Sequence, residues 1–356
     1  MRTGVSMKLV WLGLLVAFSL ALVPGASAQP GEFVKGVLQP LADGFPKRAI
    51  TLICADEPGS RDGITIRAMQ QALRGISPVP ILVSDEPLAQ GGGFHKAKDL
   101  LDREGTIEGY YPLARTVSGE SQDLLCEPIT KETGMDIHDM NLVIVQETIP
   151  YVLCQRKNAP WGRTFAELLK YGKANPGKLK YISNGVGSGN DIATSWILTT
   201  FGLQVKKMPQ QNAGATLSVI GAGEGDFALA TAFAVQPHWQ AGRVDPVLVT
   251  GPSVPPPWNT DPNVVTMVQA GLPLLPMGIV AGFSVPKQTP QSHIDWLFKL
   301  FKAGALSDAY RTREKTIIGC TIEVLTPKEA NELKMKIYAE SEPVVRAIGL
   351  HWDQQK

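Results

Sequence analysis

Apolar and polar positions follow two different periods in the first half of the chain. Short apolar runs of strand length occur at residues 49–55, 80–84 and 106–111. The first run, AITLICA, is apolar at almost every position, which is typical of a strand buried on both faces of a parallel sheet. After it, Ile66, Met69 and Leu73 follow helical spacing. Strands that alternate with helices in this way predict βαβ units and an α/β fold.

The middle of the chain departs from this alternation. Residues 119–134 are polar and follow neither period, so we expect an irregular surface segment there. Residues 141–145 and 151–154 are again apolar and predict two strands. Ile149-Pro150 separates them, and we expect the chain to pass from one domain to the other at this dipeptide.

Residues 175–198, NPGKLKYISNGVGSGNDIATSWIL, form the stretch around which the second half is organised. A helix precedes it, because Thr164 and Glu167 have the spacing of a capping box. Asn175-Pro176-Gly177 is expected to end this helix, since proline bars further helical hydrogen bonds and glycine accepts a positive φ. Residues 179–183 then predict a strand.

A glycine-rich turn, residues 184–189, follows this strand, and we expect Asn190 or Asp191 to cap the next helix. Free N–H groups and the positive end of a helix dipole make such a turn a potential anion site. Taken alone, the segment fits an ordinary tight turn equally well. A second copy of the device favours the anion site, because the strand at residues 49–55 also leads through a glycine-bearing loop into a helix.

The N-terminus has the pattern of a cleavable export signal. Arg2 and Lys8 form a basic region, residues 9–22 are apolar, and Ala26-Ser27-Ala28 is a small-x-small cleavage site. The apolar run is shorter than the roughly 20 residues that a membrane-spanning helix needs. We therefore expect residues 1–28 to be removed, residues 29–45 to form an N-terminal extension, and the protein to reside in the periplasm.

Charge and cysteine content narrow the possible partners. The leader holds two of the 34 basic residues and none of the 33 acidic ones, so the remaining surface is close to neutral. This balance argues against nucleic acid as a partner. The four cysteines permit disulfides, although Cys54 and Cys154 lie in apolar runs where a thiol packs as a small hydrophobe. Their spacing fits no CxxC motif, and we expect neither a metal nor a cofactor.

No catalytic constellation emerges from the sequence. The five histidines are far apart and form no HxxxH or HExxH pair. Gly187-Ser188-Gly189 fails the G-x-S-x-G pattern because Val186 stands before it, and Asn190 replaces the third glycine of G-x-G-x-x-G. Two anion-binding loops without a base or nucleophile between them predict a binding protein, not an enzyme.

Several motifs resemble the Bug proteins, the extracytoplasmic solute receptors of tripartite tricarboxylate transporters. The most specific is ANPGKL at residues 174–179, within the longer similar stretch TFAELLKYGKANPGKLKYISNGVGSGNDIA. Others are the opening at residues 46–50, the Pro58-Gly59 loop followed by Arg67, Gly225-Asp226, and the AGLP run at residues 270–273. The resemblance extends over nearly all of the chain after the leader.

This resemblance implies an α/β periplasmic binding protein of the Venus-flytrap kind, type II-like, in which each lobe is a sheet flanked by helices. The first lobe would comprise residues 46–148 and 276–356, and the second lobe residues 149–275. In the family, a small carboxylate is held between the lobes, largely by backbone amides and ordered water.

The expected ligand-binding residues lie on the two loops and on one neighbouring segment. They are Glu57, Ser60, Arg61, Asp62, Asn184, Gly187, Ser188, Gly189, Asn190, Asp191 and Gln210. For Arg61 two roles remain open, an ion pair with a neighbouring carboxylate or a bidentate clamp on the ligand.

The chain departs from the family pattern on both sides of this expected site. Ser60 stands where a glycine is usual, the loop aspartate Asp62 comes one position early, and Asp191 replaces a common histidine. Gln210-Gln211 replaces an aromatic and a basic residue, and Ala230 replaces an aspartate common near the end of its strand.

The expected partners are a small organic acid and the membrane subunits of a tripartite tricarboxylate transporter, and we expect a monomer. Two alternatives remain open at this point: a ligand sensor for a signalling ectodomain, and a secreted hydrolase on the same scaffold.

Overall fold

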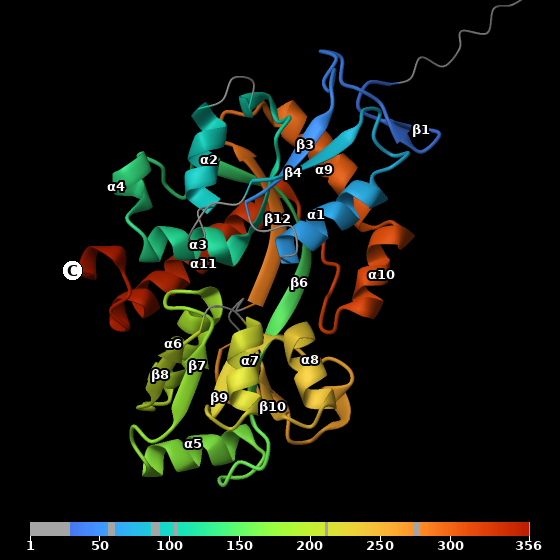
Figure 1. Cartoon of the computed structure of the whole chain (residues 1–356). Helices are drawn as coiled ribbons and strands as arrows, with labels where there is room; N and C mark the ends of the chain where they lie inside the picture. Colours follow the sequence, from blue (N-terminus) through green and yellow to red (C-terminus); the bar gives the residue numbers. More distant parts are fainter. Residues whose placement is uncertain are drawn as a thin grey trace, which may run out of the picture.

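A computed structural model describes residues 29–55, 61–86, 93–102, 106–210, 213–273 and 278–355 of the chain. Its long strands form two sheets, which lie one above the other in Figure 1, with helices on both faces of each. One strand, β6 (Met140–Arg156), belongs to both sheets. The predicted α/β fold is confirmed.

The first sheet has the order β4 (Ile81–Asp85), β3 (Ile50–Cys54), β5 (Leu113–Thr116), β12 (Gly278–Pro286) and β6. β3 pairs in parallel with β4 and β5, whereas β12 runs antiparallel to β5 and β6. The parallel pairs arise from the alternation of strand and helix that the apolar pattern predicted.

Helices cover this sheet on two faces because successive strand side chains point in opposite directions. Leu52 packs toward one face and its neighbour Ile53 toward the other. The first face carries α1 (Arg61–Ala72), α9 (Gln291–Ala305) and α10 (Asp308–Thr316). The second carries α2 (Gly93–Asp102), α3 (Val117–Cys126), α4 (Ile129–Thr133) and α11 (Pro327–Ala347).

The second sheet has the order β11 (Val265–Thr266), β10 (Val244–Val249), β6, β9 (Phe227–Thr231), β7 (Lys180–Ser183) and β8 (Lys206–Pro209). Its two cores again use alternate positions of β6. Leu153 packs with α5 (Phe165–Ala174) and α6 (Gly189–Thr200). Val152 packs with α7 (Ala213–Gly221) and α8 (Ala232–Gln240).

The two strands predicted on either side of Ile149-Pro150 are one continuous strand, so that prediction was wrong in detail. Pro150 forms the last pair of β6 with β12, opposite Gly278, and Tyr151 forms the first pair with β9, opposite Thr231. Because β6 changes partners at this point, the missing N–H of Pro150 interrupts neither ladder internally. The dipeptide thus marks the passage between the two sheets, while the exact domain boundaries remain a prediction.

Two other segments differ from their predicted structure. Residues 106–111 contain a 3₁₀ turn, Thr106–Glu108, instead of a strand, and β5 begins only after Pro112. Gly109 has φ +88°, a value that a strand residue does not adopt. The segment still borders the sheet, because the carbonyl groups of Tyr110 and Pro112 accept hydrogen bonds from β3.

Residues 119–134 are not an irregular surface segment but form most of α3 and all of α4. The polar composition of this segment led to the wrong prediction because α3 buries polar side chains against β12. Glu120 is 2% exposed and accepts a hydrogen bond of 3.0 Å from the Ser284 hydroxyl, and the Ser118 hydroxyl donates to the Gly278 carbonyl over 3.1 Å. Buried polar groups that find partners in this way do not follow an apolar period.

The predicted signals at both ends of α5 are confirmed. Thr164 and Glu167 form the predicted capping box at the start of α5, and the helix ends at Ala174 with Asn175 as its C-cap. A similar box, with Thr326 and Glu329, starts α11.

The remaining described elements are short: β1 (Phe33–Val34), β2 (Val37–Leu38) and the 3₁₀ turns Trp258–Thr260 and Trp352–Gln354. Within the described ranges, no helix is both long and apolar enough to cross a membrane. The four cysteines, all in described segments, form no disulfide.

Candidate functional site

The first predicted loop is described only from Arg61 onward, so Glu57 and Ser60 lie outside the described residues. Arg61 and Asp62 begin α1 and form an ion pair with each other. The guanidinium of Arg61 also lies 3.8 Å from a carboxylate oxygen of Glu147 on β6. Of the two roles left open for Arg61, pairing with a neighbouring carboxylate is therefore formed in the structure.

The second predicted loop joins β7 to α6, and its N-cap is Ser188 instead of Asn190 or Asp191. The Gly187 N–H donates a hydrogen bond of 2.9 Å to Oδ2 of Asp191, and the ammonium group of Lys207 pairs with the same oxygen. Asp191 has no exposed surface. A carboxylate in the first turn is favoured by the helix dipole, so the loop donates to the chain's own anion.

The other predicted residues of this loop are arranged as follows. The Asn190 amide donates to the Leu229 carbonyl over 2.9 Å, which ties the loop to β9. The Ser188 hydroxyl lies 2.8 Å from both the Gly185 carbonyl and Oδ1 of Asn190. Gln210 donates its backbone N–H to the Ser183 carbonyl over 2.8 Å. The carboxamide oxygen of Asn184 is buried and accepts no hydrogen bond.

Gly189 is the place where the loop meets the first sheet's helices. A Cβ atom at Gly189 would lie 2.7 Å from the side-chain oxygen of Gln122 on α3 and 3.1 Å from the hydroxyl of Tyr151 on β6. Only glycine permits this approach without displacing a neighbour. Gly187 approaches α3 as well, since a Cβ there would lie 3.7 Å from the sulfur of Cys126.

Tyr151 of β6 lies next to the start of α6. Burial raises the pKa of its hydroxyl to about 12, while the positive charge of Arg61 acts in the opposite direction. Arg61 lies 3.8 Å from Glu147, four positions before this tyrosine on β6. The structure brings the described end of the first loop and the start of α6 to one region around Tyr151.

Glu147 is the central polar residue that our sequence analysis missed. Its carboxylate has no exposed surface and is bound by Arg313, whose Nε and Nη2 atoms lie 3.0 and 3.1 Å from its two oxygens. Thr65 and Tyr310 donate hydroxyl hydrogen bonds of 3.0 and 3.1 Å. The network joins β6 to α1 and α10 next to Arg61.

The ionic character of this network is reflected in the pKa of its members. Burial alone would lower the pKa of Arg313, but the charge and hydrogen bonds of Glu147 raise it above its ordinary value. Burial and the same carboxylate raise the pKa of Tyr310 well above its ordinary value. A sequence signal did exist, because Gln146-Glu147 is a polar pair within an otherwise apolar strand.

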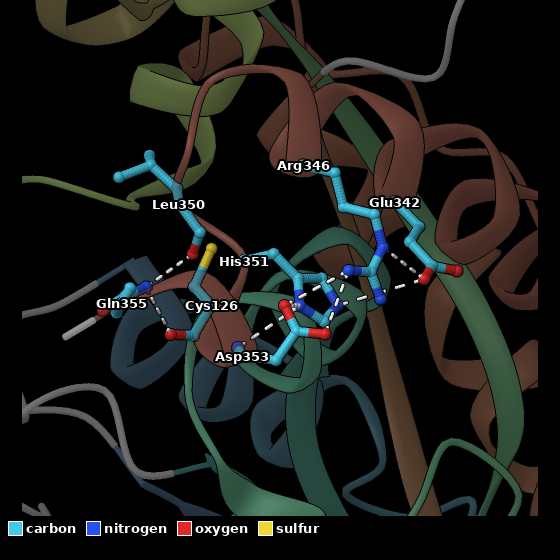
Figure 2. Close-up of polar contacts among 7 residues, drawn as sticks. All are labelled: Cys126, Glu342, Arg346, Leu350, His351, Asp353 and Gln355. Carbon is cyan, nitrogen blue, oxygen red and sulfur yellow. Dashed lines mark hydrogen bonds and ion pairs between the residues drawn. The ribbon is translucent and has the colours of Figure 1, made fainter.

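The C-terminal segment supports α3 where it approaches Gly187. Figure 2 shows the amide of Gln355 donating to the carbonyl groups of Cys126 and Leu350, over 3.0 and 2.5 Å. Beside them Asp353 pairs with His351 at 2.6 Å and with Arg346 at 3.0 Å. These contacts anchor the chain end on α3 and α11.

A separate cavity of about 1,080 Å³ adjoins the passage between the sheets. Thr148 and Pro150 of β6 line it together with residues 250–257 and part of α11. None of the predicted ligand residues belongs to its lining.

The profile of a family described as "Tripartite tricarboxylate transporter family receptor" matches residues 67–350. The chain belongs to this family. Its members are solute receptors for transport and not enzymes, and the predicted class is confirmed at this level.

Known proteins similar to this receptor agree with the assignment. A UPF0065 protein of Bordetella pertussis is 26% identical over 272 residues, which are 76% of this chain and 80% of that protein. A solved structure described as a periplasmic transporter has a TM-score of 0.71 at 22% identity, covering 87% of this chain and 100% of the other.

Two further structures were solved with a bound acid. MatC of Rhodopseudomonas palustris with bound malate has a TM-score of 0.67 at 18% identity, covering 85% of this chain and 100% of the other. An R. palustris protein with adipate has a TM-score of 0.67 at 20% identity, covering 86% and 98%. These likenesses confirm the periplasmic binding protein fold.

The Glu147 network gives a prediction for stability. Arg313→Met leaves a buried carboxylate without its main partner, so we expect a loss of roughly 3–5 kcal/mol in the free energy of unfolding, measured in urea. Adding Glu147→Gln to this variant should recover part of the loss. As a matched control, Arg346→Met removes two exposed ion pairs, with Glu342 and Asp353, and should cost no more than about 1 kcal/mol. A double variant less stable than Arg313→Met alone would contradict this account.

Proposed function

We propose that this receptor captures a small organic carboxylate between its two sheets and delivers it to the membrane subunits of a tripartite tricarboxylate transporter. The observation that carries the proposal is the convergence of both predicted loops on one part of β6, Glu147 to Tyr151. Arg61 begins one loop's helix and lies 3.8 Å from Glu147, and a Cβ atom at Gly189, at the end of the other loop, would lie 3.1 Å from the Tyr151 hydroxyl. A solute there would contact both sheets at once.

The family relationship supports the remaining parts of the proposal. Proteins of similar fold were solved with malate and with adipate, which are both small organic acids. The ligand would be held chiefly by backbone amides and the side chains named above. The two lobes would divide near Pro150, where β6 changes its partners, and the receptor would act as a periplasmic monomer.

The bound solute should be recoverable. Denaturing the purified protein is expected to release an unchanged small organic acid that mass spectrometry identifies. Protein refolded without it should bind the same acid again in calorimetry, with one site per chain. Release of a hydrolysed product, or failure to bind any of a panel of organic acids, would contradict the proposed function.

The Arg61→Lys variant distinguishes the two roles of Arg61, an ion pair with a neighbouring carboxylate and a bidentate clamp on the ligand. Because Arg61 already pairs with Asp62 and lies next to Glu147, we expect the affinity for the identified acid to change by only a few tenths of a kcal/mol. A bidentate clamp would instead lose roughly 1–3 kcal/mol, the value of a hydrogen bond to a charged group. Arg67→Lys on the same helix, where arginine pairs with Asp85, is the control for general effects on α1.

The leader gives a further test of localisation. We expect the protein recovered from the periplasm to begin at Gln29, because residues 26–28 have the small-x-small pattern of a cleavage site. N-terminal sequencing measures this directly. A chain that keeps its first 28 residues and stays in the cytoplasm would be incompatible with the proposal.

A further inference from the structure

The donors of the β7–α6 loop are already bound to an anion of the chain itself. Oδ2 of Asp191 accepts the Gly187 N–H and pairs with the ammonium group of Lys207. The carboxylate has no exposed surface, whereas 30% of the Lys207 side chain is exposed. The loop therefore contains the interaction that a ligand carboxylate would otherwise make there.

Among the described residues, three buried side-chain oxygen atoms of β7, this loop and α6 have no hydrogen-bond partner. They are Oγ of Ser183, Oδ1 of Asn184 and Oδ1 of Asp191. Ser183 and Asp191 are at most 1% exposed. Amide and carboxylate oxygens accept hydrogen bonds and cannot donate them. A group that enters beside them is therefore favoured when it brings N–H or O–H donors.

The nearby cations are also matched by anions. Arg61 pairs with Asp62, Arg313 with Glu147, and Lys207 with Asp191. A second ligand carboxylate at the β7–α6 loop would thus approach a buried negative charge without a cation of its own, and like charges at short range repel strongly in a poorly solvated site.

We propose that Asp191 determines specificity as a resident anion, so that the solute meets the β7–α6 loop with an uncharged or positively charged donor group. The ligand class is then a monocarboxylate whose far end carries an amide, hydroxyl or ammonium group, and not a dicarboxylate. This inference rests on the proposed function, which supplies the single carboxylate.

Adipate and its half-amide, adipamate, test the far end of the ligand directly because they differ chiefly in one charge. We expect the parent protein to bind adipamate at least tenfold more tightly than adipate in calorimetry. Asp191→Asn removes the resident charge and should reduce or reverse this ratio by a factor of ten or more. A parent that prefers adipate, or a ratio that Asp191→Asn leaves unchanged, would overturn the proposal.

Asp226→Asn is the matched control. Asp226 lies just before β9 and, like Asp191, accepts one backbone N–H, from Lys180 at 2.8 Å, and pairs with one base, Arg156 at 3.0 Å. Because it lies at the opposite end of the strands from the loop, its replacement should leave the ratio of the two affinities unchanged. A shift as large as that of Asp191→Asn would show that any lost charge suffices and would overturn the proposal.

Inorganic sulfate provides a test that does not depend on the identity of the solute. In Asp191→Asn the positive charge of Lys207 and the helix N-terminus no longer face a resident negative charge, so sulfate should raise the melting temperature of this variant but not that of the parent or of Asp226→Asn. Absence of this gain would overturn the resident-anion proposal. If the parent binds no organic acid at all, the proposed function fails while sulfate still decides the role of Asp191.

Lys207→Gln covers the case in which Asp191→Asn does not fold. It removes the partner of Asp191 at a partly exposed position and leaves the carboxylate with less compensation. The preference for adipamate should then persist or increase. A tenfold fall in that preference would mean that Lys207 serves the ligand and not Asp191, and would overturn the proposal.

Discussion

The structure depends on the continuity of β6 through both sheets. A single 17-residue strand runs through the two cores and exchanges its partners between Pro150 and Tyr151. Four positions before Tyr151 it carries Glu147, a carboxylate with no exposed surface. A buried charge of this kind is tolerated only when it is paired and hydrogen-bonded, and Arg313, Tyr310 and Thr65 meet that requirement. The same network fixes α1 and α10 against the strand and so determines where Arg61 lies.

Much of the fold could be predicted from the sequence because its signals are local. The capping box at Thr164 and the stop at Asn175 act within one helical turn, and the structure contains both. The segment that became α3 could not be predicted in the same way. Its polar residues Ser118 and Glu120 face β12, and their partners Gly278 and Ser284 lie more than 150 positions away in sequence. Polar groups that are buried through such distant contacts do not follow the helical spacing of apolar residues, so the helix could not be recognised from that spacing.

In the candidate site, too, local signals could be recognised from the sequence, whereas long-range contacts could not. The β7–α6 loop was identified from its glycines, yet its donors were taken to be available to a ligand. Asp191 lies four residues after Gly187, and a carboxylate in the first turn of a helix is electrostatically favoured. That local signal could have been read from the sequence. The pairing with Lys207 needed the register of β7 with β8, and the proximity of Gly189 to Gln122 needed the tertiary arrangement.

The two sheets are also joined by an apolar contact beside the β7–α6 loop. Leu125 of α3, Ile192 of α6 and Val345 of α11 form one buried cluster. Full burial of such a side chain contributes about 1.5–3 kcal/mol, so this contact by itself adds at most a few kcal/mol to the cost of a movement about Pro150 that separates Ile192 from its two partners. The ligand proposed to contact both sheets would supply interactions of the same order. This apolar contact by itself is therefore too weak to lock the sheets together.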